Sequence, residues 1–545
     1  MKKAIPLGVV NYEDLRTEDY YFVDKSLMIK DFLDRGNEVT LITRPRRFGK
    51  TINMSMMAEF FDITKDSCEL FADTLIMETE YAAMINQYPT IFITFADAKG
   101  DKERIIEMIK DVLLKEYDRF SYVFEKLSPI QNIRYQKILK ACCSDDLHNK
   151  SFGNALSFLM EQLEMYYSKK VMVFIDEYDT PFIEAHVGGF YEEIRSGLAS
   201  MLHNALKTSN SLQYAMLTGI QRVAKENIFS DLNNLVVCTV KDLEYAQYFG
   251  FSEEEVQEAL GYYGLTLNDE VKSMYDGYRF GEHEIYNPWS ILNYASRKVL
   301  DPYWVNTSGN KMIRKAMASS DDAFKRGYEE LIQTGKLETL VRMETSFFEI
   351  NTTENLWGLL VNAGYLTIFK TISSKEGLYV IKVPNQEVQE EFQKLTSYYL
   401  KVDGTDMVTM FSALKRNKKE DFSDKYQKIL LSLPSYHDLK DENSYHMMLL
   451  GMCAWLSSEY EITSNREVGK GRCDIILKAK NENQISYILE FKYTKDRNDD
   501  LQELAKAAVN QIKDRKYDEG STGKVIYIGL AHYRKEAVIE WQENY

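Results

Sequence analysis

Short apolar runs alternate with longer helical stretches between residues 38 and 240. Each run is rich in Val, Ile, Phe or Thr. Continuous apolar runs of this kind are typical of strands that are buried on both faces of a parallel sheet. Their alternation with helices predicts an α/β domain. The predicted strands are Val39–Thr43, Thr90–Phe95, Val171–Asp176, Gln213–Thr218 and Leu235–Val240.

The pattern becomes mainly helical from about residue 250 to 430. Ser252–Tyr263 and Asp322–Thr334 read as helices, whereas Phe347–Ile350 and Leu378–Val383 are short aromatic-rich pieces. We expect a mainly helical lid or linker region here.

A third pattern begins near residue 440. A helix, two strand-like runs, a second helix and another strand follow one another, which is the order of a small α/β domain. The predicted domains are therefore 1–250, 251–435 and 436–545. The elements predicted in the last domain are Tyr445–Leu456, Asp474–Leu477, Ile485–Phe491, Leu501–Tyr517 and Lys524–Ile528.

The composition of the 545 residues is that of a globular protein. Hydrophobic residues make up 45% and aromatic residues 13%, which excludes a disordered or low-complexity chain. Lys and Arg number 67 against 83 Asp and Glu, so the net charge is −16. This acidic balance argues against a broadly basic nucleic-acid binder, although it does not exclude a local basic groove.

The six cysteines are scattered and form no CxxC pair. Neither a zinc ribbon nor a disulfide framework is indicated, and reduced thiols in a cytoplasmic protein are expected. The apolar part of Met1–Val10 is too short, and too soon followed by acidic residues, for a signal peptide. No long apolar run occurs, so no membrane span is expected.

A candidate phosphate-binding loop follows the first predicted strand and reads RPRRFGKT. Gly49, Lys50 and Thr51 match the end of the P-loop pattern, but Arg44 replaces its first glycine. Gly49 would let the backbone approach phosphate. Lys50 would reach the β- and γ-phosphates, and Thr51 would ligate Mg²⁺. Such a short motif is common by chance, but the flanking strand and helix favour a nucleotide site.

Two carboxylates end the predicted strand Val171–Asp176. Asp176 would hold Mg²⁺ or its water shell. Glu177 would orient and deprotonate an attacking water. The alternative is a strand that ends in solvated acids, but the P-loop upstream favours a site of nucleotide hydrolysis.

A further polar group follows the predicted strand Gln213–Thr218. Thr218 ends that strand, and Arg222 and Lys225 come just beyond it. Thr218 is a candidate sensor of the γ-phosphate, and Arg222 or Lys225 would neutralise charge in the transition state. A surface turn with charges at a helix start is the alternative interpretation.

These motifs resemble those of the AAA-ATPase-like family over residues 5 to about 250. That family usually has the same arginine-rich loop. The resemblance implies that Arg44 is compatible with the site and that Arg46, Arg47 and Phe48 belong to it. The stretches that carry the resemblance are YFVDKS, RPRRFGKT, FIDEYDTP and TGIQRVAKENIFSDLNN.

Two stretches just beyond, YDGYRFG and YNPWSIL, also resemble signatures of that family. They match no catalytic pattern with a physical rationale. We expect Tyr275, Asp276, Arg279 and Trp289 to make packing or interdomain contacts.

A second group of carboxylates lies near the C-terminus. Asp474 begins one predicted strand. Glu490 and Lys492 lie on one face of the next, because side chains alternate along a strand. Asp474 and Glu490 would bind Mg²⁺ or Mn²⁺, and Lys492 would position or polarise a water. A lone E-x-K is weak evidence, but the aspartate in the preceding strand indicates a phosphodiesterase site.

This group resembles the PD-(D/E)XK nuclease superfamily over about residues 440 to 530. Gln511 and Tyr517 on the next predicted helix support the resemblance. Many of these nucleases carry an acidic ligand on the first helix, where this chain has His446 and no carboxylate. Either His446 or Glu467 is expected to complete the metal site, and a degenerate fold used only for binding is the alternative.

Together these features lead us to expect an ATP-binding and ATP-hydrolysing protein with a metal-dependent nuclease domain that ATP regulates. ATP and Mg²⁺ are the expected cofactors, with Mn²⁺ as an option at the nuclease site. Nucleic acid, DNA in the first place, is the expected partner. A homo-oligomer is compatible with the sequence, and no membrane is expected. The alternative functions are a signalling or scaffold ATPase that binds without cutting and a slowly hydrolysing nucleotide switch.

Overall fold

Contacts divide the chain into two compact units, Met1–Ile313 with Leu340–Glu387 and Arg314–Thr339 with Val388–Tyr545. The predicted division into three domains stays a prediction. The computed structural model describes residues 2–144, 147–223, 233–304, 313, 316–317, 320–345, 352–389, 392, 402–433, 442–456, 459–468, 471–481, 483–518 and 523–544. None of the helices in these ranges is both long and apolar enough to cross a membrane.

A five-stranded parallel sheet forms the centre of the first unit. All residues of β1 and β3 are buried, as expected for strands that are covered on both faces. The predicted α/β class with a parallel sheet is confirmed, and the carboxyl ends of the strands lie at one edge. The strand order is β2 (Thr90–Thr94), β3 (Val171–Asp176), β4 (Leu212–Gly219), β1 (Val39–Thr43) and β6 (Leu235–Cys238).

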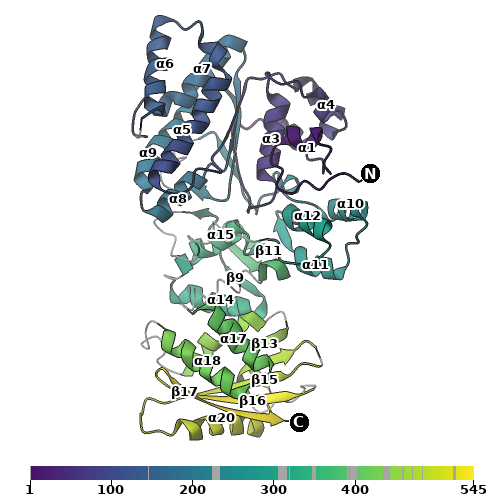
Figure 1. Cartoon of the computed structure of the whole chain (residues 1–545), viewed down its shortest axis with the longest axis vertical. Helices are drawn as coiled ribbons and strands as arrows, with labels where there is room; N and C mark the ends of the chain where they lie inside the picture. The colour runs from purple at the N-terminus through teal and green to yellow at the C-terminus, as the bar shows by residue number, and fades with distance from the viewer. Residues whose placement is uncertain are drawn as a thin grey trace. The chain divides into compact units, whose positions relative to one another are not determined.

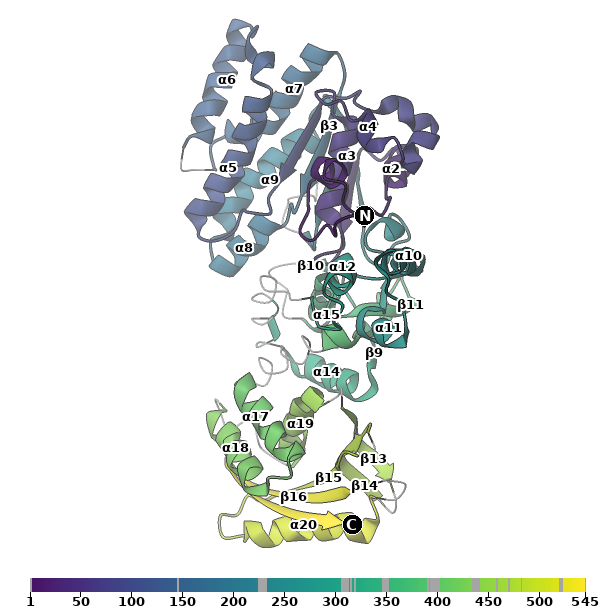
Figure 2. The same cartoon turned by 45° about the vertical axis from the view of Figure 1, so that its right-hand side comes forward.

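Helices cover both faces of this sheet (Figures 1 and 2). The first group is α1 (Tyr12–Thr17), α2 (Leu27–Arg35), α3 (Lys50–Phe61) and α4 (Cys68–Phe71). The group on the other side is α5 (Lys102–Arg119), α6 (Pro129–Cys142), α7 (Ala155–Tyr167), α8 (Thr180–Gly188) and α9 (Tyr191–Leu206).

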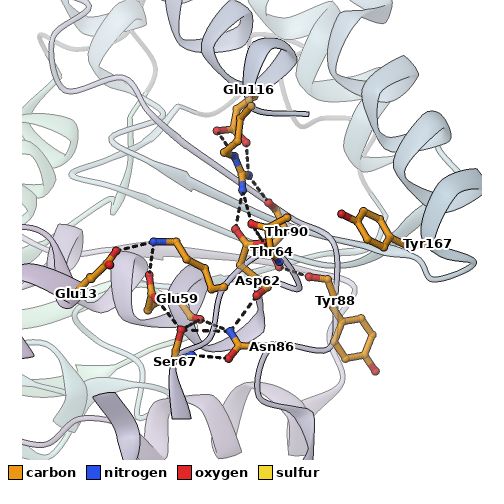
Figure 3. A network of polar contacts seen from close by, with 12 residues as sticks. Glu13, Glu59, Asp62, Thr64, Ser67, Asn86, Tyr88, Thr90, Glu116 and Tyr167 are labelled. Atoms are coloured by element: carbon orange, nitrogen blue, oxygen red, sulfur yellow. Dashed lines mark hydrogen bonds and ion pairs between the residues drawn. The ribbon is translucent and has the colours of Figure 1, made fainter. Parts of the chain in front are cut away.

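A polar network anchors the end of α3 that lies away from the P-loop (Figure 3). The Arg119 guanidinium donates hydrogen bonds to Asp62 at 2.7 Å and to the Thr90 carbonyl at 2.6 Å. It also pairs with Glu116 at 2.6 Å. Asp62 follows the last residue of α3, and Thr90 begins β2. The network therefore ties α3 and α5 to the sheet, which holds the first turn of α3 in place at the opposite edge.

Helices predominate in the middle of the chain, as predicted, and short strands accompany them. A capping box of Ser252 and Glu255 starts α10, and Asn287 followed by Pro288 starts α12. The short strand β5 (Arg222–Val223) pairs with β10. The elements are α10 (Glu253–Tyr263), α11 (Asp269–Tyr275), β7 (Tyr278–Phe280), β8 (His283–Ile285), α12 (Pro288–Arg297), α14 (Asp322–Thr334), β9 (Lys336–Leu340), β10 (Glu344–Thr345), α15 (Thr353–Ala363), β11 (Thr367–Ser373) and β12 (Leu378–Lys382).

A mixed five-stranded sheet in the order β13-β14-β15-β16-β17 forms the centre of the second unit. β15 and β16 pair in parallel, and the other neighbours are antiparallel. Helices α17 to α19 lie on one face and α20 on the other (Figure 2). The elements are α17 (Gly404–Lys415), α18 (Lys419–Ser432), α19 (Glu442–Cys453), β13 (Tyr460–Val468), β14 (Gly471–Ala479), β15 (Ser486–Tyr493), α20 (Leu501–Arg515), β16 (Val525–Tyr533) and β17 (Glu536–Asn544).

The predicted order of elements in this last domain is incomplete, because sequence analysis missed β13 and β17. These two strands form the edges of the sheet. An edge strand has a neighbour on one side only and is often charged or polar. β13 reads YEITSNREV and β17 reads EAVIEWQEN, so polar residues interrupt the apolar pattern by which the inner strands were recognised.

Candidate functional sites

The carboxyl ends of β1, β3 and β4 bring three of the predicted site residues together. Asp176 is fully buried and accepts hydrogen bonds from the hydroxyl groups of Thr51 at 2.8 Å and Thr218 at 2.6 Å. β4 lies between β1 and β3, which places Thr218 beside the aspartate. Burial raises the pKa of Asp176, and the bonds from the two hydroxyls oppose that rise. Such a carboxylate and hydroxyl are suitable ligands for Mg²⁺.

The loop between β1 and α3 wraps around its own lysine. Gly49 has φ +80°, which glycine adopts without strain, and α3 begins at the next residue. The Lys50 side chain is buried, and its ammonium donates to the carbonyls of Arg44 at 3.1 Å and Pro45 at 2.9 Å. Burial lowers the pKa of Lys50, against the effect of nearby carboxylates. The loop thus holds a cation at a helix N-terminus, where anions bind readily.

Arg44, in the position of the missing P-loop glycine, is fully buried. Its guanidinium donates to the carbonyls of Thr43 at 2.9 Å and Cys238 at 3.1 Å. A third bond runs to the Glu244 carbonyl at 3.1 Å. Burial lowers the pKa of Arg44 to about 10. The side chain therefore links the start of the loop to β6 and the segment that follows it, and it anchors the loop from inside the protein.

Phe48 and Arg46 take different positions in the loop. Phe48 is fully buried, and its ring packs against those of Tyr278 at 4.9 Å and Phe280 at 5.0 Å between centroids. Arg46 is partly exposed and lines a cavity beside the loop. The aromatic contacts fix the loop on the segment that follows α11, a region for which packing or interdomain contacts were expected.

The two acidic residues that follow Asp176 differ in their surroundings. Glu177 has φ +50°, and its carboxylate accepts a hydrogen bond from the Thr180 hydroxyl at 3.0 Å. The amine of Lys99 lies 4.0 Å from the same carboxylate. Asp179 is buried and accepts bonds at 2.9 and 2.8 Å from two backbone N–H groups that follow β4. Burial raises the pKa of Asp179 to about 6. No role was predicted for Lys99 or Asp179 from the sequence.

A cavity of about 450 Å³ adjoins the P-loop within the first unit. Polar groups of Arg46, Lys50, Thr51, Lys99 and Glu177 contribute to its wall. The volume lies in the range of small-molecule sites. Apolar side chains complete the wall, and they come from the N-terminal segment, the segment before α10 and α12: Val9, Val10, Phe22, Phe251, Trp289 and Leu292.

Arg222 lies away from this cavity wall. Within the described part of the chain, it forms an ion pair with Glu344, and β5 pairs with β10 at this position. Lys225, the alternative candidate, lies outside the described residues. A role for either residue in neutralising transition-state charge stays a prediction.

Arg47 connects the P-loop to α12 and the chain that follows it. Its guanidinium donates to the Tyr303 carbonyl at 2.9 Å and lies 4.5 Å from the centre of the Trp289 ring. The indole N–H of Trp289 donates to the same carbonyl at 3.0 Å. Trp289, for which packing or interdomain contacts were expected, thus also lines the cavity and contacts the loop.

A buried carboxylate lies directly behind this contact. Glu387 is fully buried and accepts hydrogen bonds from the Ser290 hydroxyl at 2.8 Å and the Trp304 N–H at 2.6 Å. Burial raises the pKa of Glu387 to about 7 from an ordinary value of 4.5. Because the unfolded chain releases this proton first, the folded state loses stability as the pH rises from about 4.5 through 7.

Replacing Glu387 with glutamine is expected to raise the melting temperature at pH 8 and to have a smaller effect at pH 5.5. Glutamine keeps a carbonyl for the Trp304 N–H and avoids the buried charge. The difference between the ordinary pKa of 4.5 and the folded-state pKa of about 7 corresponds to about 3 kcal/mol of unfolding free energy lost at pH 8. Less than half of this loss is present at pH 5.5. Thermal unfolding of both proteins at the two pH values measures the difference. An equal difference at both pH values would contradict this account.

The second site lies on β14 and β15 in the second unit. Ile475 pairs with Leu489, and extending this antiparallel register by one residue places Asp474 opposite Glu490. The Asp474 carboxylate accepts a hydrogen bond from the Phe491 N–H at 2.8 Å. Facing residues on paired strands lie on the same side of a sheet. The two predicted carboxylates are therefore neighbours.

The Glu490 carboxylate is buried, and only one of its two oxygens accepts hydrogen bonds among the described residues. Its Oε1 accepts hydrogen bonds from the Gln511 amide of α20 and from Lys492 Nζ at 3.4 Å. Its Oε2 is buried and has no hydrogen-bond partner among the described residues. Burial and the Asp474 carboxylate raise the pKa of Glu490 to about 7, against the effect of Lys492. A buried, unpartnered carboxylate oxygen beside a second carboxylate fits a divalent cation.

The third ligand of this site stays open between His446 and Glu467. The His446 ring is buried, and its Nε2 lies 3.0 Å from the Asp474 carbonyl. Burial lowers the pKa of His446. Glu467 pairs with Arg472 in the β13–β14 register, but its side chain lies outside the described part of the structure. Side chains within that part form no metal-binding group of three or more His, Cys, Asp or Glu residues.

The two sheets and their polar sites define the class of protein: a P-loop NTPase fold joined to a nuclease-like α/β domain. Residues 6–229 match the family described as Predicted AAA-ATPase, and residues 440–542 match the PD-(D/E)XK nuclease superfamily. The chain therefore combines an AAA-ATPase-like domain with a PD-(D/E)XK nuclease superfamily domain, as its motifs predicted. An uncharacterised protein in the vnfD 5′ region of Azotobacter chroococcum mcd 1 is 28% identical over 395 residues, which cover 71% of this chain and 69% of that protein.

Proposed function

We propose that the protein binds and hydrolyses ATP in its first unit and cleaves a phosphodiester bond of nucleic acid, DNA in the first place, in its second. The observation that carries cleavage is the Oε2 atom of Glu490, which is buried beside Asp474 and has no hydrogen-bond partner in the part of the chain that the structure describes. Leaving such an oxygen unpaired costs stability. A fold that only binds nucleic acid has no need of it, whereas a metal-dependent nuclease does.

The nucleotide half of the proposal rests on the cavity beside the P-loop. Lys50 would exchange its two loop carbonyls, at 3.1 and 2.9 Å, for the β- and γ-phosphates. Thr51 and Asp176 would hold the Mg²⁺ ion that accompanies ATP and neutralises phosphate charge. The base would pack on the apolar wall of the cavity near Trp289. Glu177, at the polar wall, would accept a proton from the attacking water.

The nuclease half rests on the pair of carboxylates. Asp474 and Glu490 would hold Mg²⁺ or Mn²⁺, which supplies an activated water and neutralises the leaving oxygen. Gln511 keeps the Glu490 carboxylate in a fixed orientation through its hydrogen bond. Lys492 is close enough to Glu490, at 3.4 Å, to orient that water or to contact the scissile phosphate. We further propose that the nucleotide state regulates cleavage, because the two sites share one chain.

The test is cleavage of end-labelled single- and double-stranded DNA and RNA by the full chain, with Mg²⁺ or Mn²⁺ and with or without ATP. We expect cleavage that EDTA and Asp474→Asn abolish and that Lys478→Ala, at an exposed position on the same strand, leaves unchanged. A response to ATP that Lys50→Ala removes would support regulation. ATP binding without cleavage of any substrate would favour a scaffold or switch instead.

A further inference from the structure

Lys99 lies beside the carboxylate that we propose as the acceptor of the water proton. Its Nζ is 4.0 Å from Glu177 Oε2, and both residues line the same cavity as Lys50. An attacking water that hydrogen-bonds to Glu177 must also approach the γ-phosphorus to within about 3.5 Å. A cation this close to Glu177 therefore lies within reach of the γ-phosphate oxygens.

The turn that carries Lys99 is held firmly by the sheet. The Phe95 N–H donates to the Asp176 carbonyl at 3.0 Å, which ties the turn to the end of β3. Ala98 is buried, and its N–H donates to the Phe95 carbonyl at 3.0 Å. Gly100 has φ +116°, which favours glycine and completes the turn before α5. The backbone at Lys99 is thus fixed, while its side chain is 39% exposed and has room to reorient.

The arginines near the site are less suited to this position. The Arg44 guanidinium is fully buried, and Arg47 is bonded to the Tyr303 carbonyl. Arg222 is paired with Glu344 away from the cavity wall. Arg46 lines the cavity but belongs to the P-loop itself, like Lys50. Lys99 approaches Glu177 from the turn that follows β2, and not from the P-loop.

We propose that Lys99 contacts the γ-phosphate of ATP and is a catalytic residue of its hydrolysis. In this step the water oxygen bonds to the γ-phosphorus and the bond from phosphorus to the β–γ bridging oxygen breaks. ADP leaves with that electron pair, and Glu177 takes the water proton. Lys99 leaves Glu177 for the γ-phosphate, neutralises charge that grows on its oxygens and frees the carboxylate for the water. This inference rests on the proposed ATPase function.

The test compares Lys99→Ala and Lys99→Arg with the wild-type full chain and with Lys102→Ala. Lys102 is a matched control, because it is a lysine three residues further on whose side chain is about as exposed as that of Lys99, 41% against 39%. We expect Lys99→Ala to lower kcat for ATP about 100-fold and Lys99→Arg to restore part of that loss. Because ADP lacks the γ-phosphate, Lys99→Ala should weaken binding of a non-hydrolysable ATP analogue about tenfold and leave ADP binding unchanged. Lys102→Ala should match the wild type in both measurements.

Hydrolysis by Lys99→Ala within twofold of wild type would overturn the assignment, as would an equal loss of affinity for ADP and the ATP analogue. In both cases the ATPase activity of the wild type would still stand, so the failure would concern Lys99 alone. A wild-type chain that binds no ATP would instead overturn the proposed function and this inference together.

Discussion

Replacing Glu490 with glutamine is expected to lower metal-dependent cleavage about a thousandfold, which corresponds to about 4 kcal/mol of activation free energy. Glutamine has the same shape, but its neutral amide is a much poorer ligand for a divalent cation than a carboxylate. The change removes the negative charge of the carboxylate, whose buried Oε2 has no hydrogen-bond partner among the described residues. Cleavage rates with Mg²⁺ and Mn²⁺, together with calorimetric titration of Mn²⁺, measure the effect.

Stability gives this prediction a second, independent readout. Burial raises the pKa of Glu490 to about 7, so the ionised side chain opposes folding at pH 8. We therefore expect Glu490→Gln to lose activity while its melting temperature without metal stays equal to that of the wild type or rises. Glu503→Gln, on the exposed side of α20, is the control for an ordinary change of charge. Cleavage by Glu490→Gln at the wild-type rate would show that Glu490 holds no catalytic metal.

Strands that are buried on both faces can be located from sequence, because every position along them is apolar. β1 and β3 have the predicted bounds, Val39–Thr43 and Val171–Asp176. Their parallel pairing also makes the meeting of Thr51 and Asp176 predictable, since the carboxyl ends of parallel strands share an edge. The edge strands β13 and β17 were missed because more than half of their residues are polar.

The apolar wall of the cavity beside the P-loop could not be predicted from the sequence for a different reason. Val9 lies outside every motif, and the stretches YFVDKS and YNPWSIL, which contain Phe22 and Trp289, assigned neither residue to this cavity. The three side chains are brought together only by the packing of distant segments. Trp289 stood in a stretch that resembles a family signature, but nothing in its spacing indicated that Arg47 would lie over its ring. Contacts of this kind depend on tertiary structure rather than on local periodicity.

Proximity in sequence to Thr218 did not predict which residues after β4 lie near the site. Arg222 comes shortly after Thr218, which made it a reasonable candidate for the γ-phosphate. The chain instead enters β5, where Arg222 pairs with Glu344, 122 residues away. Lys99 has no neighbouring motif, yet β2 pairs with β3 and brings it beside Glu177. Strand order, which a single sequence does not contain, decides which of the two cations approaches the site.

Replacing Glu177 with glutamine is expected to reduce ATP hydrolysis about a thousandfold and to leave ATP binding intact. A positioned general base contributes roughly 10²–10⁴-fold to such reactions, and glutamine still orients a water but takes no proton from it. The Thr180 hydroxyl donates a hydrogen bond to a Glu177 carboxylate oxygen at 3.0 Å, and the amide oxygen of glutamine can accept the same bond. Phosphate release and binding of a fluorescent ATP analogue measure the two effects separately.

This variant also distinguishes the regulated nuclease from an ATPase that is independent of the nuclease. The Glu177→Gln protein should accumulate in the ATP-bound state. If ATP binding promotes cleavage of the nucleic acid, cleavage by this variant should persist without ATP hydrolysis. If ATP hydrolysis is required, cleavage should stop. Glu193→Gln, an exposed acid on α9, should behave as the wild type in both assays. Unchanged hydrolysis in Glu177→Gln would assign the base to another residue. Cleavage that is indifferent to Glu177→Gln, Lys50→Ala and ATP would show that the two domains act separately, each through the residues of its own sheet.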